Sequence, residues 1–105
     1  MAHDLQFFID GAWVDPAVPN RLPVIDPSTG EAFAQISLGG PADVDRAVAA
    51  AKRAFATFGF TEPAERLELL RRVVEITRRR SPDLALAISR EMGAPLPYAL
   101  EAQVA

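Results

Sequence analysis

The hydrophobic pattern of this 105-residue chain changes its period at Gly39-Gly40. Before these glycines, short β-favouring runs are separated by turn residues. After them, apolar residues recur every three or four positions. The first pattern is typical of strands and the second of amphipathic helices. We therefore expect an α/β fold, α+β within these residues, with β-hairpins over residues 1–39 and helices over residues 40–105.

Two β-hairpins are predicted in the first part, one within residues 5–14 and one whose arms are residues 22–25 and 32–37. In the first hairpin, Asp10-Gly11 lies between the two arms. A type I′ turn needs positive φ at both central positions, and this dipeptide tolerates it. In the second hairpin, Gly30 is the expected left-handed residue of the turn.

Four helices are predicted in the second part, each with a proline near its start, where a missing N–H costs little. They begin at Pro41, at Pro63, at Pro82 and near Pro97. Thr61 is the expected N-cap of the second helix and Ser81 that of the third. Gly59 and Gly93 are expected to end the first and third helices.

The apolar residues of the helices form wide stripes. The first helix has one stripe, made of Val44, Val48, Ala51, Phe55 and Phe58. The second has two adjoining flanks, Leu67, Leu70 and Val74 on one and Leu69, Val73 and Ile76 on the next. Because these flanks cover about half of the helix circumference, the second helix is expected to pack on two neighbours.

Composition excludes several classes of function. The chain has no cysteine, so residues 1–105 hold no disulfide, thiolate metal site or cysteine nucleophile. Its net charge of −3 argues against a nucleic-acid partner. It shows neither a signal peptide nor an apolar run near the ~18 residues that a membrane span needs. We therefore expect no membrane partner and a cytoplasmic location.

The arginine cluster of the second helix is the most conspicuous charged feature. It consists of Arg71, Arg72, Arg78, Arg79 and Arg80. Glu68 lies four residues before Arg72, and Glu75 lies four before Arg79, which is the favourable order for ion pairs on a helix. A solvated, self-paired face is therefore preferred to a phosphate-binding one.

No catalytic, cofactor-binding or metal-ligating residue is assigned. Asp43 and Asp45 are expected to point in different directions on a helix, and acidic residues are favoured in the first turn of a helix. Asp10 and Asp26 lie in predicted hairpin turns, where aspartate is common. The serines at 28, 37, 81 and 89 lack a base, because the only histidine, His3, lies near the N-terminal end, where chains are usually mobile.

Two further features receive a structural interpretation. Gly39-Gly40 lacks a phosphate-loop pattern and is interpreted as the opening of a helix. The aromatic side chains of Phe7, Phe8 and Trp13 could stack on a ligand, but beside a hairpin turn they are interpreted as packing residues.

Five motifs in order carry a resemblance to a known family. They are Phe8–Val14 (FIDGAWV), Val24–Glu31 (VIDPSTGE), Asp43–Ala51 (DVDRAVAAA), Pro63–Arg66 with Leu70-Arg71, and Glu91–Pro95 (EMGAP). Over nearly its whole length, the chain resembles the N-terminal segment of the aldehyde dehydrogenase superfamily. Two departures are Ala94, where lysine is commoner, and Glu62, where many relatives have a capping Ser or Asp.

The resemblance implies a longer parent protein with an NAD(P)-binding Rossmann-like domain, a catalytic domain and an oligomerisation arm. Such a parent oxidises an aldehyde to a carboxylic acid through a cysteine thiolate, with NAD or NADP as hydride acceptor. The residues that carry this chemistry lie downstream of the part matched here. Residues 1–105 would then be part of the NAD(P)-binding side, bind no cofactor alone and be inactive alone.

Two hypotheses of function follow. In the first, the chain is an N-terminal scaffold that is incomplete without downstream polypeptide. Its partners are the rest of that polypeptide or the subunits of a homo-oligomer, and the last helix, which has a start signal but no stop signal, favours this hypothesis. In the second, the chain is a complete, small, non-enzymatic module that uses its wide apolar faces for protein interaction.

Overall fold

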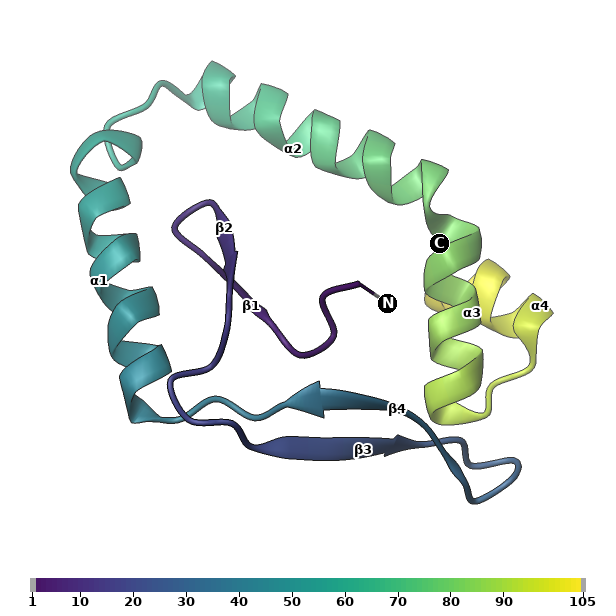
Figure 1. The fold of residues 1–105 in the computed structure, drawn as a ribbon. Coiled ribbons are helices and arrows are strands. Elements are labelled where there is room, and N and C mark those ends of the chain that lie inside the picture. The colour runs from purple at the N-terminus through teal and green to yellow at the C-terminus, as the bar shows by residue number, and fades with distance from the viewer. Residues whose placement is uncertain (1, 105) are drawn as a thin grey trace. The chain divides into compact units, whose positions relative to one another are not determined.

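Strands occupy the chain before Gly39 and helices occupy it after Gly40, as the hydrophobic pattern predicts (Figure 1). The computed structural model describes residues 2–104. These residues form two compact units, each of which is described by itself. Unit 1 contains the chain up to Val24 together with Ala32–Thr61, and unit 2 contains Ile25–Glu31 together with the chain from Glu62 onward.

The first hairpin belongs to unit 1. Strands β1 (Phe7–Ile9) and β2 (Ala12–Val14) are antiparallel, with Phe8 opposite Trp13. Asp10 and Gly11 join them with φ values of 56° and 77°. Positive φ at both positions confirms the predicted type I′ turn, whose twist matches that of the strands.

The second hairpin joins β3 (Arg21–Ile25) to β4 (Ala32–Ser37). In its turn, Gly30 has φ 74°, as predicted, and its N–H donates to the Asp26 carbonyl at 2.8 Å. At the other end, the N–H of Leu38 donates to the carbonyl of Asn20 at 2.8 Å. The hairpin arms are therefore confirmed at the predicted residues.

Helix α1 (Pro41–Phe58) packs on β1 within unit 1. Gly40 is its N-cap and Pro41 its first residue, and Gly59 is its C-cap, as predicted. The Asp10 carboxylate of the first turn forms an exposed ion pair with Arg53 of α1 at 2.9 Å. This pair joins the tip of the hairpin to the side of the helix.

Helix α2 (Pro63–Arg79) starts at the predicted proline but has Glu62, not Thr61, as its N-cap. The Glu65 side chain accepts the Glu62 N–H at 3.0 Å, which is the contact that a glutamate at the third helical position makes with an N-cap residue in a capping box. The Thr61 hydroxyl donates instead to the Phe58 carbonyl at the end of α1, at 2.8 Å. The predicted threonine cap is therefore wrong.

Helix α3 (Ser81–Met92) follows α2 after the single residue Arg80. Ser81 is its first residue rather than its N-cap, because its hydroxyl donates back to the Thr77 carbonyl at 3.1 Å. The predicted serine cap is wrong for this reason. Gly93 ends the helix with φ 72°, and its N–H donates to the Ser89 carbonyl at 2.9 Å, which confirms the predicted glycine stop.

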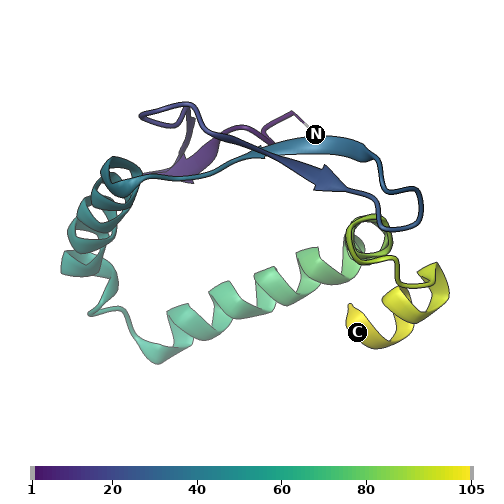
Figure 2. The ribbon, with the colours of Figure 1, turned by 90° about the horizontal axis from the view of Figure 1, so that it is seen from below.

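The fourth helical segment starts where it is predicted but has an unexpected geometry. A short turn, α4 (Leu96–Tyr98), continues into the π-helical segment η1 (Ala99–Gln103), which packs on α3. Figure 2 views α3 nearly end-on and shows η1 beside it. Ala85 of α3 and Ala99 of η1 are 1% and 0% exposed, so two alanines form the tight centre of unit 2.

The buried core is small in both units. Within residues 2–104, the buried apolar residues are Ala50, Ala85 and Ala99. No residue of α2 is buried, so neither flank of this helix packs on the two neighbours that its pattern predicts. Most large apolar side chains are consequently exposed.

Candidate functional site

Asp43 is the one buried charged residue in the part of the chain that is described. One carboxylate oxygen accepts the Ala17 N–H at 2.9 Å, and the other accepts the Gly40 N–H at 3.0 Å. The hydrogen bonds from Gly40 and then Ala17 hold the pKa of Asp43 below its ordinary value. Asp45 is exposed, so the two carboxylates form no acid–base pair.

The same contacts decide the role of Gly39-Gly40. A shallow hollow at the start of α1 contains both glycines, Pro41 and Asp43. A phosphate there would need the free N–H groups of the helix terminus. The Asp43 carboxylate already accepts the Gly40 N–H, so an anion of the chain itself occupies this position. These glycines open a helix, in agreement with the sequence interpretation.

The other two candidate aspartates also have local partners. Asp10 has the ion pair with Arg53 described above. Asp26 accepts the Ser28 hydroxyl at 2.6 Å and the Ser28 N–H at 2.8 Å. These hydrogen bonds, that of the side chain first, hold the pKa of Asp26 below its ordinary value. Both residues stabilise turns, as the sequence interpretation has it.

Three of the four serine hydroxyls have hydrogen-bond acceptors of their own. Ser28 donates to Asp26, Ser37 donates to the Leu5 carbonyl at 2.7 Å, and Ser81 donates to Thr77. The His3 ring contacts the Gln6 side chain, with Nδ1 at 2.7 Å from Oε1. Within unit 1, Ser37 and His3 therefore have separate partners and do not form a nucleophile–base pair.

The structure places the His3 ring against the first hairpin. Its ring stacks on Trp13 with centroids 4.2 Å apart and planes inclined by 2°, and Phe8 meets Trp13 edge-on at 5.2 Å. The aromatic side chains of the hairpin thus pack on one another, as predicted. The stacking of His3 on Trp13 was not predicted, because no sequence pattern links positions 3 and 13.

Two further kinds of site were considered for the described residues, a cluster of metal ligands and a membrane-spanning helix. Residues 2–104 contain no group of three or more His, Asp or Glu side chains arranged as ligands. Over the same residues, no helix combines the length and the apolar character of a membrane span.

The arginine cluster is only partly self-paired. Arg71 and Arg72 lie 4.0 and 3.9 Å from Glu68, which confirms the first predicted pair at the outer limit of an ion pair. The second predicted pair, between Glu75 and Arg79, is not formed within 4 Å in residues 2–104. Exposed pairs of this length contribute little to stability.

The uncovered apolar faces are the most extensive candidate surface. On α1, the stripe residues Val44, Val48, Phe55 and Phe58 are all exposed, Phe55 by 67%. On α2, the six residues of both flanks are between 44% and 60% exposed. Isolated apolar side chains on a surface need no explanation, but contiguous apolar faces of this kind mark interaction surfaces.

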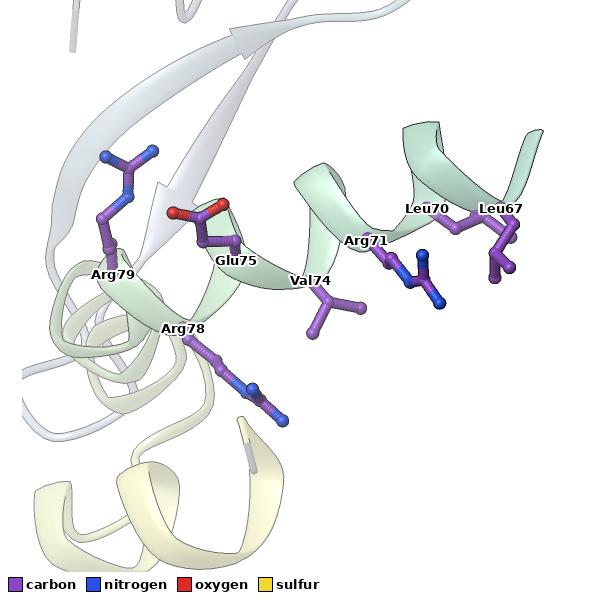
Figure 3. A pocket seen from close by; sticks show the side chains of 7 residues that line it. All are labelled: Leu67, Leu70, Arg71, Val74, Glu75, Arg78 and Arg79. Atoms are coloured by element: carbon purple, nitrogen blue, oxygen red, sulfur yellow. The ribbon is translucent and has the colours of Figure 1, made fainter. Parts of the chain in front are cut away.

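A hollow follows one flank of α2 (Figure 3). Its apolar wall is formed by Leu67, Leu70 and Val74, and Arg71 and Arg78 extend on the same side of the helix. Glu75 and Arg79 also line the hollow, although their side chains extend to the other side of the ribbon in Figure 3. All of these residues come from one helix, so the hollow is half of a packing interface rather than an enclosed site.

Comparison with known proteins identifies the relatives of this chain. The family model described as the aldehyde dehydrogenase family matches residues 13–105. The 3-succinoylsemialdehyde-pyridine dehydrogenase of a Pseudomonas species is 44% identical over 91 residues, which are 87% of this chain and 19% of that protein.

Two solved structures show the same fold. The aldehyde dehydrogenase of Bartonella henselae has a TM-score of 0.92 and 52% identity over 94% of this chain and 21% of its own. A mutant of aldehyde dehydrogenase C of Pseudomonas syringae, complexed with NAD+ and octanal, has a TM-score of 0.95 and 43% identity over 98% of this chain and 21% of its own. The chain thus spans about a fifth of the length of these relatives.

Proposed function

Because this chain belongs to the aldehyde dehydrogenase family, we propose that residues 1–105 are the N-terminal scaffold of an NAD-dependent aldehyde dehydrogenase. The whole protein would oxidise an aldehyde and water to a carboxylic acid, with transfer of a hydride to NAD+ and release of a proton. The hairpins over residues 1–39 and the helices over residues 40–105 would support this reaction by packing.

The uncovered flanks of α2 are the observation that carries the proposal. A 17-residue helix without one buried residue has little tertiary stabilisation on its apolar flanks. Most helical stability in proteins comes from packing of an apolar face. The relatives, of which this chain spans about a fifth, contain the additional polypeptide that could provide it. The faces would then pack against the rest of the same polypeptide or against subunits of a homo-oligomer.

The start of α1 gives no support for NAD binding by the described residues. A dinucleotide pyrophosphate binds at a glycine-rich helix start with free N–H groups. At the start of α1, the only such glycine pair of the chain, the Asp43 carboxylate accepts the Gly40 N–H. We therefore propose that no residue of this chain is catalytic or cofactor-binding, and that these groups belong to the remaining polypeptide.

The proposal is tested by reading the gene beyond codon 105 and assaying the complete product. We expect a longer reading frame whose product forms NADH only when an aldehyde is present. The 105-residue chain prepared alone should form none. A frame that closes directly after codon 105, with a monodisperse product, would instead support the non-enzymatic interaction module. NADH formation by the 105-residue chain would refute the scaffold role.

The cellular location of the protein and its other partners are also proposals. We propose a cytoplasmic protein without nucleic-acid or membrane partners, on the basis of a net charge of −3 and of the helices found in residues 2–104. Retention of the complete product in a membrane pellet, or a mobility shift with DNA at low salt, would contradict this.

A further inference from the structure

The hollow on α2 has a basic border although the chain as a whole is acidic. Helix α2 carries five arginines and three glutamates, whereas the net charge of the chain is −3. Beside Leu67, Leu70 and Val74, the hollow is lined by three arginines, Arg71, Arg78 and Arg79, and by one carboxylate, that of Glu75. The charge next to this apolar wall is therefore positive.

Two of these arginines, Arg71 and Arg78, extend on the same side of the helix as the apolar wall (Figure 3) and are poorly compensated within residues 2–104. Arg71 has only the 4.0 Å contact with Glu68, and Arg78 has no ion pair within 4 Å there. A polypeptide that covers the apolar wall would remove water from both guanidinium groups. Charges that lose water at an interface are costly unless an opposite charge meets them. The covering polypeptide is thus expected to bring carboxylates.

The spacing of the two arginines indicates what kind of element fits. They are seven residues apart, so they lie about 10 Å apart along the axis and on the same side of the helix. The apolar residues at 67, 70 and 74 follow the three–four spacing with which one helix packs lengthwise on another. A helix with carboxylates at positions i and i+7 matches both features.

A second copy of α2 is a poor occupant of this surface. In an antiparallel pair of identical helices, the residues that border the apolar seam on one side meet their own counterparts. Arg71 and Arg78 would then face the same arginines of the other copy, and like charges across an interface are unfavourable.

We infer that the α2 hollow is covered by a helix of the same, longer polypeptide that presents two carboxylates, seven residues apart, to Arg71 and Arg78. This inference rests on the proposed function, because it requires polypeptide beyond residue 105. The inference adds the chemistry of the contact to that proposal: the covering helix carries carboxylates beside the apolar residues that pack on α2.

Two neighbouring arginines provide a matched test. Arg71 and Arg72 lie 4.0 and 3.9 Å from Glu68, and their side chains are 69% and 68% exposed. They differ in that Arg71 lines the hollow and Arg72 does not. Arg71→Glu and Arg72→Glu therefore change the same charge and each remove a contact with the same carboxylate, at positions about 100° apart around one helix.

The measurement is denaturant unfolding of both variants in the complete gene product. We expect Arg71→Glu to raise the unfolding equilibrium constant at least on the order of tenfold more than Arg72→Glu, because it opposes a carboxylate across a dry contact. Arg78→Glu should behave like Arg71→Glu. Arg71→Lys, which keeps the charge, should stay close to the parent protein.

Equal unfolding equilibrium constants for Arg71→Glu and Arg72→Glu would overturn the inference. It would also be overturned if the effect of Arg71→Glu increased on dilution of the protein, because that dependence indicates a contact with a second copy. Aldehyde-dependent NADH formation is measured on the same samples. An active product with equally stable variants overturns only the acidic contact. An inactive product whose variants differ overturns the proposed function instead.

Discussion

Asp43 connects two parts of unit 1 that are 26 residues apart in the sequence. Its two oxygens accept one N–H from the loop after β2 and one from the residue before α1. A buried carboxylate is costly without such donors. The residue therefore belongs to the architecture of the unit rather than to a reaction.

Replacing this carboxylate is expected to destabilise the chain. Asp43→Asn keeps one acceptor oxygen but turns an amide N–H₂ towards a backbone N–H, so one buried donor loses its partner. We expect a lower urea midpoint than for Asp45→Asn, which alters an exposed carboxylate two residues away. Equal midpoints for the two variants would show that the Asp43 contacts do not stabilise the fold.

The two lowered pKa values predict how stability depends on pH. Asp26 and Asp43 both have folded-state pKa values below the ordinary 3.8, so as pH falls the unfolded chain binds protons first. Their contribution is present above pH 3.8 and is lost as pH falls through the lower folded pKa values. Urea midpoints measured down a pH series should show this loss, and Asp43→Asn should make it smaller. A slope unchanged by Asp43→Asn would contradict the assignment.

Sequence patterns predicted the local role of Asp43 but not its distant contact. A first-turn aspartate follows from the helix start at Pro41. The partner at Ala17 and the stacking of His3 on Trp13 depend on where the chain returns after a turn. No local pattern contains that information.

At the scale of elements, Gly93 is the clearest case of a backbone position that determines a boundary. Its φ of 72° lies in the left-handed region, and a Cβ there would lie 3.0 Å from Pro27 Cγ in the same unit. Both the conformation and the close approach favour glycine. The end of α3 is fixed at this residue.

Gly93→Ala is expected to cost about 1–2 kcal/mol in unfolding free energy for the left-handed conformation, plus a further cost for the contact with Pro27. Gly30→Ala is the matched variant, because Gly30 has φ 74° and no atom within 4 Å of its Cβ position. Thermal unfolding should show the larger loss for Gly93→Ala. A loss no larger than that of Gly30→Ala would mean that Pro27 moves aside freely.

The helix starts were predicted better by proline than by hydroxyl residues. Pro41 and Pro63 open α1 and α2 because their missing N–H falls where no partner exists. Thr61 and Ser81 were mistaken for caps because a hydroxyl can equally donate to a carbonyl of the preceding helix. Which of the two it does depends on the angle between successive helices, and sequence does not give that angle.

For the whole molecule, the amount of apolar sequence exceeds what the described fold buries. Half of the residues are hydrophobic, yet the buried apolar residues of 2–104 are three alanines. The width of the α2 stripe predicted that more than one neighbour is needed. The neighbours themselves could not be predicted, because an apolar stripe does not specify which polypeptide covers it. The family relationship supplies the expectation that further polypeptide covers these faces.

Amide hydrogen exchange of α2 tests this claim most directly. It is measured on the 105-residue chain alone and on the complete gene product. We predict little protection in the short chain, because a helix without a buried face is marginal in water, and strong protection of the same amides in the complete product. If the α2 amides exchange equally fast in both, these faces are not packed against the remaining polypeptide, and the scaffold account is wrong.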